Sequence, residues 1–333
     1  MQMRSVCENS QKTMRALVTG GGGFIGSHLV SLLLKAGAEV VVFDRDGGAR
    51  PTHAGSVHYV SADLLNRAAI STALAGVDVV FHLAWSGIPR SSNEDSSAHV
   101  SLNLVPTLVL FDACINLSVR RVVFLSSGGA VYGSVAELPI TEEHPTRPIS
   151  AYGVTKLAAE AYLEFYSRQH NLDYVILRPS VPYGEAQNIK RGQGAVGVFL
   201  NSAITGEPIT LWGGRNIARD FFYVGDLAKA CLAAAHETVE RGVYNIGGGR
   251  AITLGHLLDL VQDVTHTRLN VKVEPSRSFD PPSIVLDITR ARHCLGWEPE
   301  VSILAGVERT WKWLRPSRQS ETGTLASTVS SIL

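Results

Sequence analysis

The chain has 333 residues, 45% of them hydrophobic and 18% charged, which is enough to bury a full core and to divide into two lobes. Thirty basic and thirty acidic residues cancel, which disfavours a nucleic-acid binder because that class usually carries a basic excess. The four cysteines have neither the spacing of a zinc site nor that of a disulfide framework, so we expect a reduced, cytoplasmic protein without a metal.

Apolar runs typical of strands alternate with helical patterns over the first half of the chain. The runs are apolar without interruption, as in parallel strands covered on both faces. Their alternation with helices predicts an α/β fold with a doubly wound, Rossmann-type parallel sheet. The expected strands are Arg15–Thr19, Glu39–Asp44, Val57–Ser61, Val77–Leu83, Arg121–Ser126 and Tyr174–Arg178. The expected helices are Gly26–Ala36, Arg67–Leu74, Val100–Leu117 and Ser150–His170.

The second half of the chain differs in composition. Shorter elements between Gly- and Pro-rich segments follow Arg178 and predict a smaller α/β lobe at the C-terminal end, which binds the substrate. The polar segments 1–13 and 317–333 are predicted to be disordered tails. We assign the Rossmann-type domain to residues 14–180 with about 215–245, and the smaller lobe to residues 181–214 and 246–316.

One stretch, Ala16–Leu34, is long and apolar enough to suggest a membrane span. Its four consecutive glycines and its histidine favour a buried strand, a loop and a helix instead. The polar residues before it do not resemble a signal peptide. We therefore expect no membrane partner.

The stretch "VTGGGGFIGSHLV" follows the first expected strand and opens the first expected helix. Gly20, Gly23 and Gly26 have the spacing of a dinucleotide-binding loop, in which backbone N–H groups approach a pyrophosphate at a helix N-terminus. We expect these glycines, with Phe24 and Ile25 between them, to contact a dinucleotide.

Acidic residues follow the next two expected strands. The Asp44 carboxylate can accept hydrogen bonds from both hydroxyls of an adenosine ribose, and it would repel a 2′-phosphate, so the sequence favours NAD over NADP. The adjacent Arg45 leaves NADP open. Asp63, followed by Leu64, is a candidate for binding the adenine edge.

Tyr152 and Lys156 lie four residues apart in "SAYGVTKLAAEAY", and hence on one helical face. A tyrosine with a pKa of about 10 is a poor base at neutral pH. A nearby ammonium and an oxidised nicotinamide would both stabilise the phenolate and lower that pKa. In isolation such a pair is more often a surface tyrosine beside a solvated lysine, but downstream of the glycine loop it predicts a catalytic base.

Further motifs make the chain similar to extended short-chain dehydrogenases/reductases of the nucleotide-sugar epimerase/dehydratase family, and within it to UDP-glucose 4-epimerases. The similarity extends over residues 14–314. The motifs are "FHLA" at 81–84, Asn103, "LRPSVPYG" at 177–184, "RDFFYVGDLA" at 219–228, "YNIGGG" at 244–249 and "LGWEP" at 295–299. The resemblance implies a homodimer formed through helices 100–117 and 150–170. It also implies that NAD contacts Leu83, Ala84, Asn103 and Ser126.

The resemblance also implies a Ser or Thr at the end of the fifth strand that hydrogen-bonds the sugar 4-oxygen. In "VVFLSSGGAVYG" this position is Gly128, so either Ser127 supplies the hydroxyl or catalysis depends on Tyr152 alone. We favour Ser127, and we expect the glycines to clear space for a pyranose. Gly129 and Ala130 stand where related dehydratases carry an acid pair, which disfavours a 4,6-dehydratase.

For the nucleotide end of the substrate, the resemblance points to two arginines and an aspartate. Arg219 and Arg277 would grip a diphosphate, and Asp280 would bind a ribose hydroxyl. The alternative to a substrate-binding role for Arg219 is a surface ion pair with Asp220. Trp85 occupies a position that lines the sugar site in relatives. The alternative is that it is simply a residue of the hydrophobic core.

Together these features predict an NAD-dependent epimerase that inverts C4 of a UDP-hexose, UDP-hexosamine or UDP-hexuronate through a 4-keto intermediate, in polysaccharide or glycoconjugate synthesis. A nucleotide-sugar 4-ketoreductase or dehydratase is the enzymatic alternative. The other alternative is a regulator that binds NAD and a nucleotide sugar without catalysis. It is suggested by Gly128, which lacks the expected hydroxyl, and by Val181, which replaces an asparagine that contacts substrate in relatives. The retained Tyr152 and Lys156 argue against a regulator.

Overall fold

The computed structural model describes residues 13–45, 57–87, 92–135, 137–189, 194–276 and 283–315. The predicted tails therefore lie outside the described residues, apart from residue 13. A 7-stranded parallel sheet has the order β11-β6-β5-β4-β1-β2-β3. This is a doubly wound order, and it confirms the predicted Rossmann-type fold. Its strands are β1 (Arg15–Thr19), β2 (Glu39–Asp44), β3 (Val57–Ser61), β4 (Val79–His82), β5 (Arg121–Leu125), β6 (Asp173–Pro179) and β11 (Gly242–Ile246).

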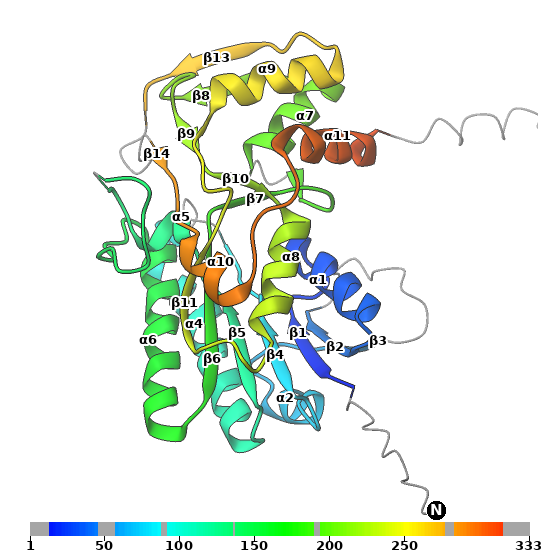
Figure 1. Ribbon diagram of the computed structural model, residues 1–333, viewed down its shortest axis with the longest axis vertical. Coiled ribbons are helices and arrows are strands. Elements are labelled where there is room, and N and C mark those ends of the chain that lie inside the picture. The colour runs from blue at the N-terminus through cyan, green and yellow to red at the C-terminus, as the bar shows by residue number, and fades with distance from the viewer. Residues whose placement is uncertain are drawn as a thin grey trace, which may run out of the picture.

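Helices cover both faces of this sheet (Figure 1). One face packs against α1 (Phe24–Lys35), α8 (Val224–Ala234) and α10 (Thr289–Leu295), and the other packs against α2 (Arg67–Ala73), α4 (Ser96–Asn116) and α6 (Ala151–His170). The central strands β4 and β5 are buried along their whole length, which explains their uninterrupted apolar sequence.

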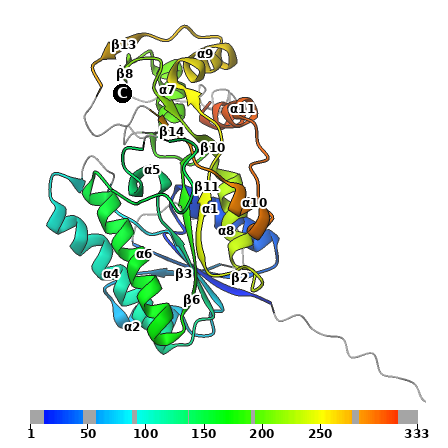
Figure 2. The same cartoon turned by 60° about the vertical axis from the view of Figure 1, so that its left-hand side comes forward.

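The two long helices α4 and α6 lie side by side (Figure 2). Each begins at a capping side chain, because Asp95 accepts a hydrogen bond from Ala98 N and Ser150 accepts one from Gly153 N. Among the described residues, α4 alone has the length and apolar composition to cross a membrane. Eight of its residues are buried within the protein, as in a core helix.

Apart from the short helix α5 (Gly128–Val131), which packs against α6 and β6, the remaining elements form a smaller lobe above the carboxyl end of the sheet (Figure 1). Its core joins α7 (Ala195–Thr205), α9 (Leu254–Thr265) and α11 (Ile303–Leu314) to short strands. These strands are β7 (Val181–Tyr183), β8 (Ile209–Trp212), β9 (Ala218–Arg219), β10 (Phe221–Tyr223), β12 (Ile252–Thr253), β13 (Val271–Glu274) and β14 (Ser283–Ile284). Two parts of the domain assignment are corrected by the structure. Within the segment assigned to this lobe, α10 and the buried Trp297 pack instead in the core of the large sheet. Conversely, Phe221 and Tyr223 of β10, which fall in the range of about 215–245 assigned to the Rossmann-type domain, pack in the core of the smaller lobe.

Candidate active site

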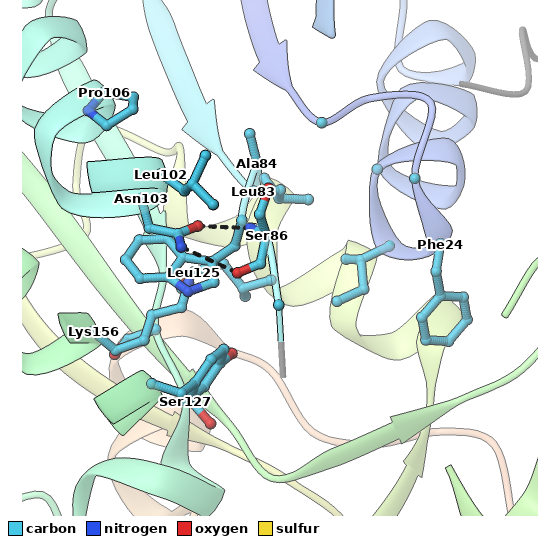
Figure 3. A pocket seen from close by; sticks show the side chains of 18 of the residues that line it. Phe24, Leu83, Ala84, Ser86, Leu102, Asn103, Pro106, Leu125, Ser127 and Lys156 are labelled. Carbon is cyan, nitrogen blue, oxygen red and sulfur yellow. Dashed lines mark hydrogen bonds between the residues drawn. The ribbon is translucent and has the colours of Figure 1, made fainter. Parts of the chain in front are cut away.

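A cavity of about 1150 Å³ opens at the carboxyl ends of the sheet strands. It lies where the strand order reverses between β1 and β4, which is where doubly wound folds bind ligands. Figure 3 shows Phe24 on one side of it and Lys156 with Ser127 on the other. Every residue predicted to contact the cofactor lines it: Gly20, Gly23, Phe24, Ile25, Gly26, Asp44, Arg45, Asp63, Leu64, Leu83, Ala84, Asn103, Ser126, Tyr152 and Lys156.

The glycine loop has room for backbone but not for side chains. A Cβ on Gly20 would lie 2.9 Å from Ala84 Cα, and one on Gly26 would collide with the carbonyl oxygen of Gly20. Gly23 caps α1 without any side-chain hydrogen bond. The first turn of α1 therefore presents its N–H groups to the cavity, and the loop fits the pyrophosphate of a dinucleotide.

The side chains at the end of β2 are held in place by hydrogen bonds. Asp44 Oδ2 accepts from Gly22 N at 3.0 Å. Arg45 Nη2 donates to Ser86 Oγ at 2.7 Å, so the guanidinium reaches toward the end of β4 rather than toward Asp44. The Ser86 backbone in turn exchanges two hydrogen bonds with the Asn103 side chain (Figure 3). This arrangement leaves a carboxylate, not a guanidinium, beside the glycine loop, which fits NAD.

Tyr152, Lys156 and Ser127 meet at the other end of the cavity. Lys156 Nζ donates to the Leu125 carbonyl oxygen at 2.6 Å and is buried. Burial raises the pKa of Tyr152 to about 12, and a hydrogen bond with the Ser127 side chain acts in the opposite direction. Burial also lowers the pKa of Lys156 well below its usual value, against a raising effect of Glu160. Both charged forms are therefore disfavoured, and positive charge in the cavity would favour the phenolate.

Sequence reasoning missed an ion pair behind these residues. Glu160 lies one turn after Lys156, and its carboxylate pairs with Arg178 of β6 at 2.5 Å while both side chains are almost fully buried. Glu160 also accepts a hydrogen bond from Ser126 Oγ, and Arg178 donates to the Tyr132 hydroxyl at 2.9 Å. The repeat of Tyr152, Lys156 and Glu160 every four residues on one helical face was the available signal.

Gly128 does not line the cavity, which corrects the expectation that it clears space for a sugar. A Cβ at this position would lie 2.5 Å from Leu286 Cδ1 and 2.9 Å from the Arg178 carbonyl oxygen. Leu286 therefore fills the space beside Gly128. The room comes from Gly129, which does line the cavity and whose Cβ would approach nothing closer than Ser180 O at 4.0 Å.

Of the three residues predicted to bind the nucleotide, the structure describes one. Arg219 lies on β9 outside the cavity lining, with Nη1 donating to Ala218 O at 2.8 Å. Asp220 is fully buried and accepts hydrogen bonds from Gly248 N and Leu286 N, so it is not part of a surface ion pair. Arg277 and Asp280 lie outside the described residues.

Two further predicted residues, Val181 and Trp85, line the cavity. Trp85 also packs against the core on the α4 face of the sheet, so both interpretations of this residue hold in part. His82, in the same strand-end motif, is buried and hydrogen-bonded at both ring nitrogens, to Thr19 and Thr107. Burial lowers its pKa to about 3, so it is neutral and structural.

Comparison with known proteins agrees with this site. Residues 16–247 match the NAD dependent epimerase/dehydratase family, and the chain belongs to that family. It is 32% identical over 314 residues to the UDP-glucose 4-epimerase of Mycolicibacterium smegmatis, covering 92% of this chain and 100% of that one.

Two solved structures are similar over 90% of this chain and 98% of their own. The UDP-glucose 4-epimerase of Thermotoga maritima, solved with UDP-glucose, has 32% identity and a TM-score of 0.85. The UDP-glucose 4-epimerase of Thermus thermophilus, solved with NAD, has 34% identity and a TM-score of 0.82. The predicted cofactor, NAD, is thereby confirmed.

Proposed function

We propose that the protein is an NAD-dependent nucleotide-sugar epimerase that inverts C4 of a UDP-hexose, UDP-hexosamine or UDP-hexuronate. The observation that carries this proposal is the meeting of Tyr152, Lys156 and Ser127 in a cavity that also contains the dinucleotide loop. Gly129 and Ala130, which line the same cavity, bear no carboxyl group that could exchange a proton during loss of water. The site therefore supports epimerisation better than dehydration.

The proposed reaction needs one base and no net redox change. Bound NAD would supply a reversible hydride acceptor for C4 of the sugar, so that the configuration can invert without net redox change. Tyr152, as the phenolate, removes the proton of the 4-hydroxyl and, as the phenol so formed, later returns it. Ser127 lies within hydrogen-bonding distance of that phenol, and with substrate bound it would donate its single hydroxyl proton to the sugar 4-oxygen. The absent side chain of Gly129 leaves room for the ketone to turn over.

The nucleotide is bound from the smaller lobe in this proposal. Arg219 and Arg277 hold the diphosphate, Asp280 a ribose hydroxyl, and Val181 and Trp85 lie along the sugar. A bound UDP-glucose in the similar Thermotoga maritima enzyme supports a uridine nucleotide. The reaction would supply sugar nucleotides in the cytoplasm for polysaccharide or glycoconjugate synthesis.

We extend the proposal to a homodimer formed through α4 and α6. These adjacent helices expose apolar side chains to solvent, including Val100 and Val105 on α4 and Val154, Tyr162 and Phe165 on α6. Single exposed apolar residues are common, but several of them on two adjacent long helices favour contact with a second copy.

Turnover of defined sugar nucleotides tests the function. Purified protein with NAD is incubated with UDP-glucose, UDP-N-acetylglucosamine or UDP-glucuronate, and the C4 epimers are separated by chromatography. Formation of an epimer without accumulation of NADH is the expected result, and Tyr152→Phe should abolish it while NAD still binds. A stoichiometric loss of NADH or NADPH with a 4-keto sugar would instead identify a ketoreductase. Full activity of Tyr152→Phe would eliminate the proposed base.

A further inference from the structure

The Lys156 ammonium rests on the face of an indole. Its Nζ lies 3.6 Å from the centroid of the Trp85 ring, closer than to any other aromatic ring described around it. We infer that Trp85 is a positioning residue that keeps Lys156 protonated and holds its ammonium beside the ring of Tyr152, 5.9 Å from that ring's centroid. This inference rests on the proposed function, because it concerns the same tyrosine–lysine pair.

The surroundings of Lys156 explain why an aromatic face matters. An ammonium has three N–H donors, and one of them is used by the Leu125 carbonyl oxygen. Phe124, at 4.8 Å from Nζ, and Trp85 form the apolar wall of the site. The negative face of an indole attracts a cation most strongly of all aromatic rings, and more so where water is excluded. Trp85 thus replaces part of the hydration that burial removes.

The orientation of the indole is set by packing rather than by a hydrogen bond. The Trp85 ring packs edge-on against the Tyr152 ring, with 6.3 Å between the ring centroids. The corresponding centroid distances are 6.3 Å to the His99 ring and 6.0 Å to the Phe124 ring. Its Nε1 is buried without a hydrogen-bond partner among the described residues. The side chain therefore leaves a polar atom unpaired while presenting its face to Lys156 and its flank to Tyr152.

Several charged or titratable groups face Lys156 from the elements around it. They are His82 on β4, His99 on α4, Tyr152 and Glu160 on α6, and Arg178 on β6, paired with Glu160. Both histidines have pKa values lowered mainly by burial and further by the Lys156 charge, so neither adds positive charge at neutral pH. Glu160 favours the ammonium, but Arg178 neutralises much of its field. After the hydrogen bond to the Leu125 carbonyl oxygen, the indole face is the nearest group described here that stabilises the ammonium.

The pH profile of turnover separates positioning of Lys156 from simple lining of the sugar site. Loss of the aromatic face lowers the pKa of Lys156. When pH is raised, the ammonium of the variant therefore loses its proton earlier, and activity falls at a lower pH than in the starting protein. Trp85→Leu should shift the basic limb of the kcat profile down by about one pH unit, and Trp85→Phe should shift it less. A raised KM with an unchanged profile in both variants would overturn the inference.

A second test does not depend on turnover. In a double-mutant cycle at pH 6, the shift in urea midpoint caused by Trp85→Leu should be at least halved when Lys156 is replaced by Met. Trp311, a half-buried tryptophan in the smaller lobe, provides the control, because Trp311→Leu should cause the same shift in both backgrounds. Equal shifts for Trp85→Leu would refute the inference. If the two substitutions are coupled in stability but no UDP-sugar is turned over, the proposed function is refuted while the pairing of Trp85 with Lys156 is supported.

Discussion

Replacing Gly128 by alanine tests how the strand tip is built. The new methyl group would lie 2.5 Å from Leu286 Cδ1 and 2.9 Å from the carbonyl oxygen of Arg178. Leu286 is fully buried, and its backbone N–H donates to the buried carboxylate of Asp220 at 3.2 Å. Arg178 belongs to β6, which is paired on both sides. Neither neighbour can move away without breaking other contacts.

The cost follows from overpacking. An extra methyl group in a well-packed core costs about 1–3 kcal/mol of unfolding free energy. Relief by movement of the short helix α5 (Gly128–Val131) would displace Ser127, which caps it. A displacement of about 1 Å at a reacting group can reduce the rate on the order of 10²-fold. We therefore expect Gly128→Ala to lose both stability and turnover.

Gly129→Ala is the matched control, since it adds the same methyl group one residue further along the same helix. Nothing lies within 4.0 Å of that methyl group's expected position except Ser180 O at that limit. Alanine also favours a helix over glycine, so this variant should unfold at the same or a slightly higher urea concentration, followed by circular dichroism. If Gly128→Ala were as stable and active as the starting protein, Leu286 would not close this space.

Other consequences concern charge and association. Burial raises the pKa of Asp220 to about 6, so between about pH 4 and 6 the folded state retains a proton that the unfolded state releases. The free energy of unfolding should therefore fall as pH rises from about 4 to 6. In urea titrations, Asp220→Asn should remove this dependence on pH. Glu160→Gln should cost about 3–5 kcal/mol of unfolding free energy, since it leaves Arg178 buried without its partner, and Glu160→Gln with Arg178→Met should recover part of the loss. Phe165→Glu should convert a dimer to a monomer in light scattering, whereas Trp313→Glu, at a similarly exposed tryptophan on α11, should not.

Local sequence was sufficient for much of the fold. The bounds of β1, β2 and β3 match their expected ranges. The apolar runs within β1 and β2 are continuous and largely buried, which leaves little choice for where these strands begin and end, whereas β3 is an edge strand with no buried residue. β11 was missed as a strand of the large sheet. Its five residues pair with β6, and this partner is far away in the sequence, so no local pattern announces the pairing.

The same distinction separates the predicted from the missed parts of the site. Residues at the carboxyl ends of parallel strands converge whatever the rest of the fold does, so the loop motifs could be assigned to one cavity in advance. The filling of the space beside Gly128 by Leu286 depends on a distant segment, and so does the pairing of Glu160 with Arg178. Those contacts follow from tertiary packing, which propensity and spacing do not encode.

The burial of Tyr152 and Lys156 links base strength to occupancy of the cavity. Burial favours the neutral phenol and the neutral amine, because each charged form loses its hydration. A cationic ring entering the cavity would repel the ammonium but attract the phenolate, and an ammonium held on the Trp85 face at 3.6 Å would resist that repulsion. If Tyr152 is the base, as proposed, its phenolate would therefore form most readily when oxidised cofactor is present, which would favour proton removal in the state able to accept the hydride.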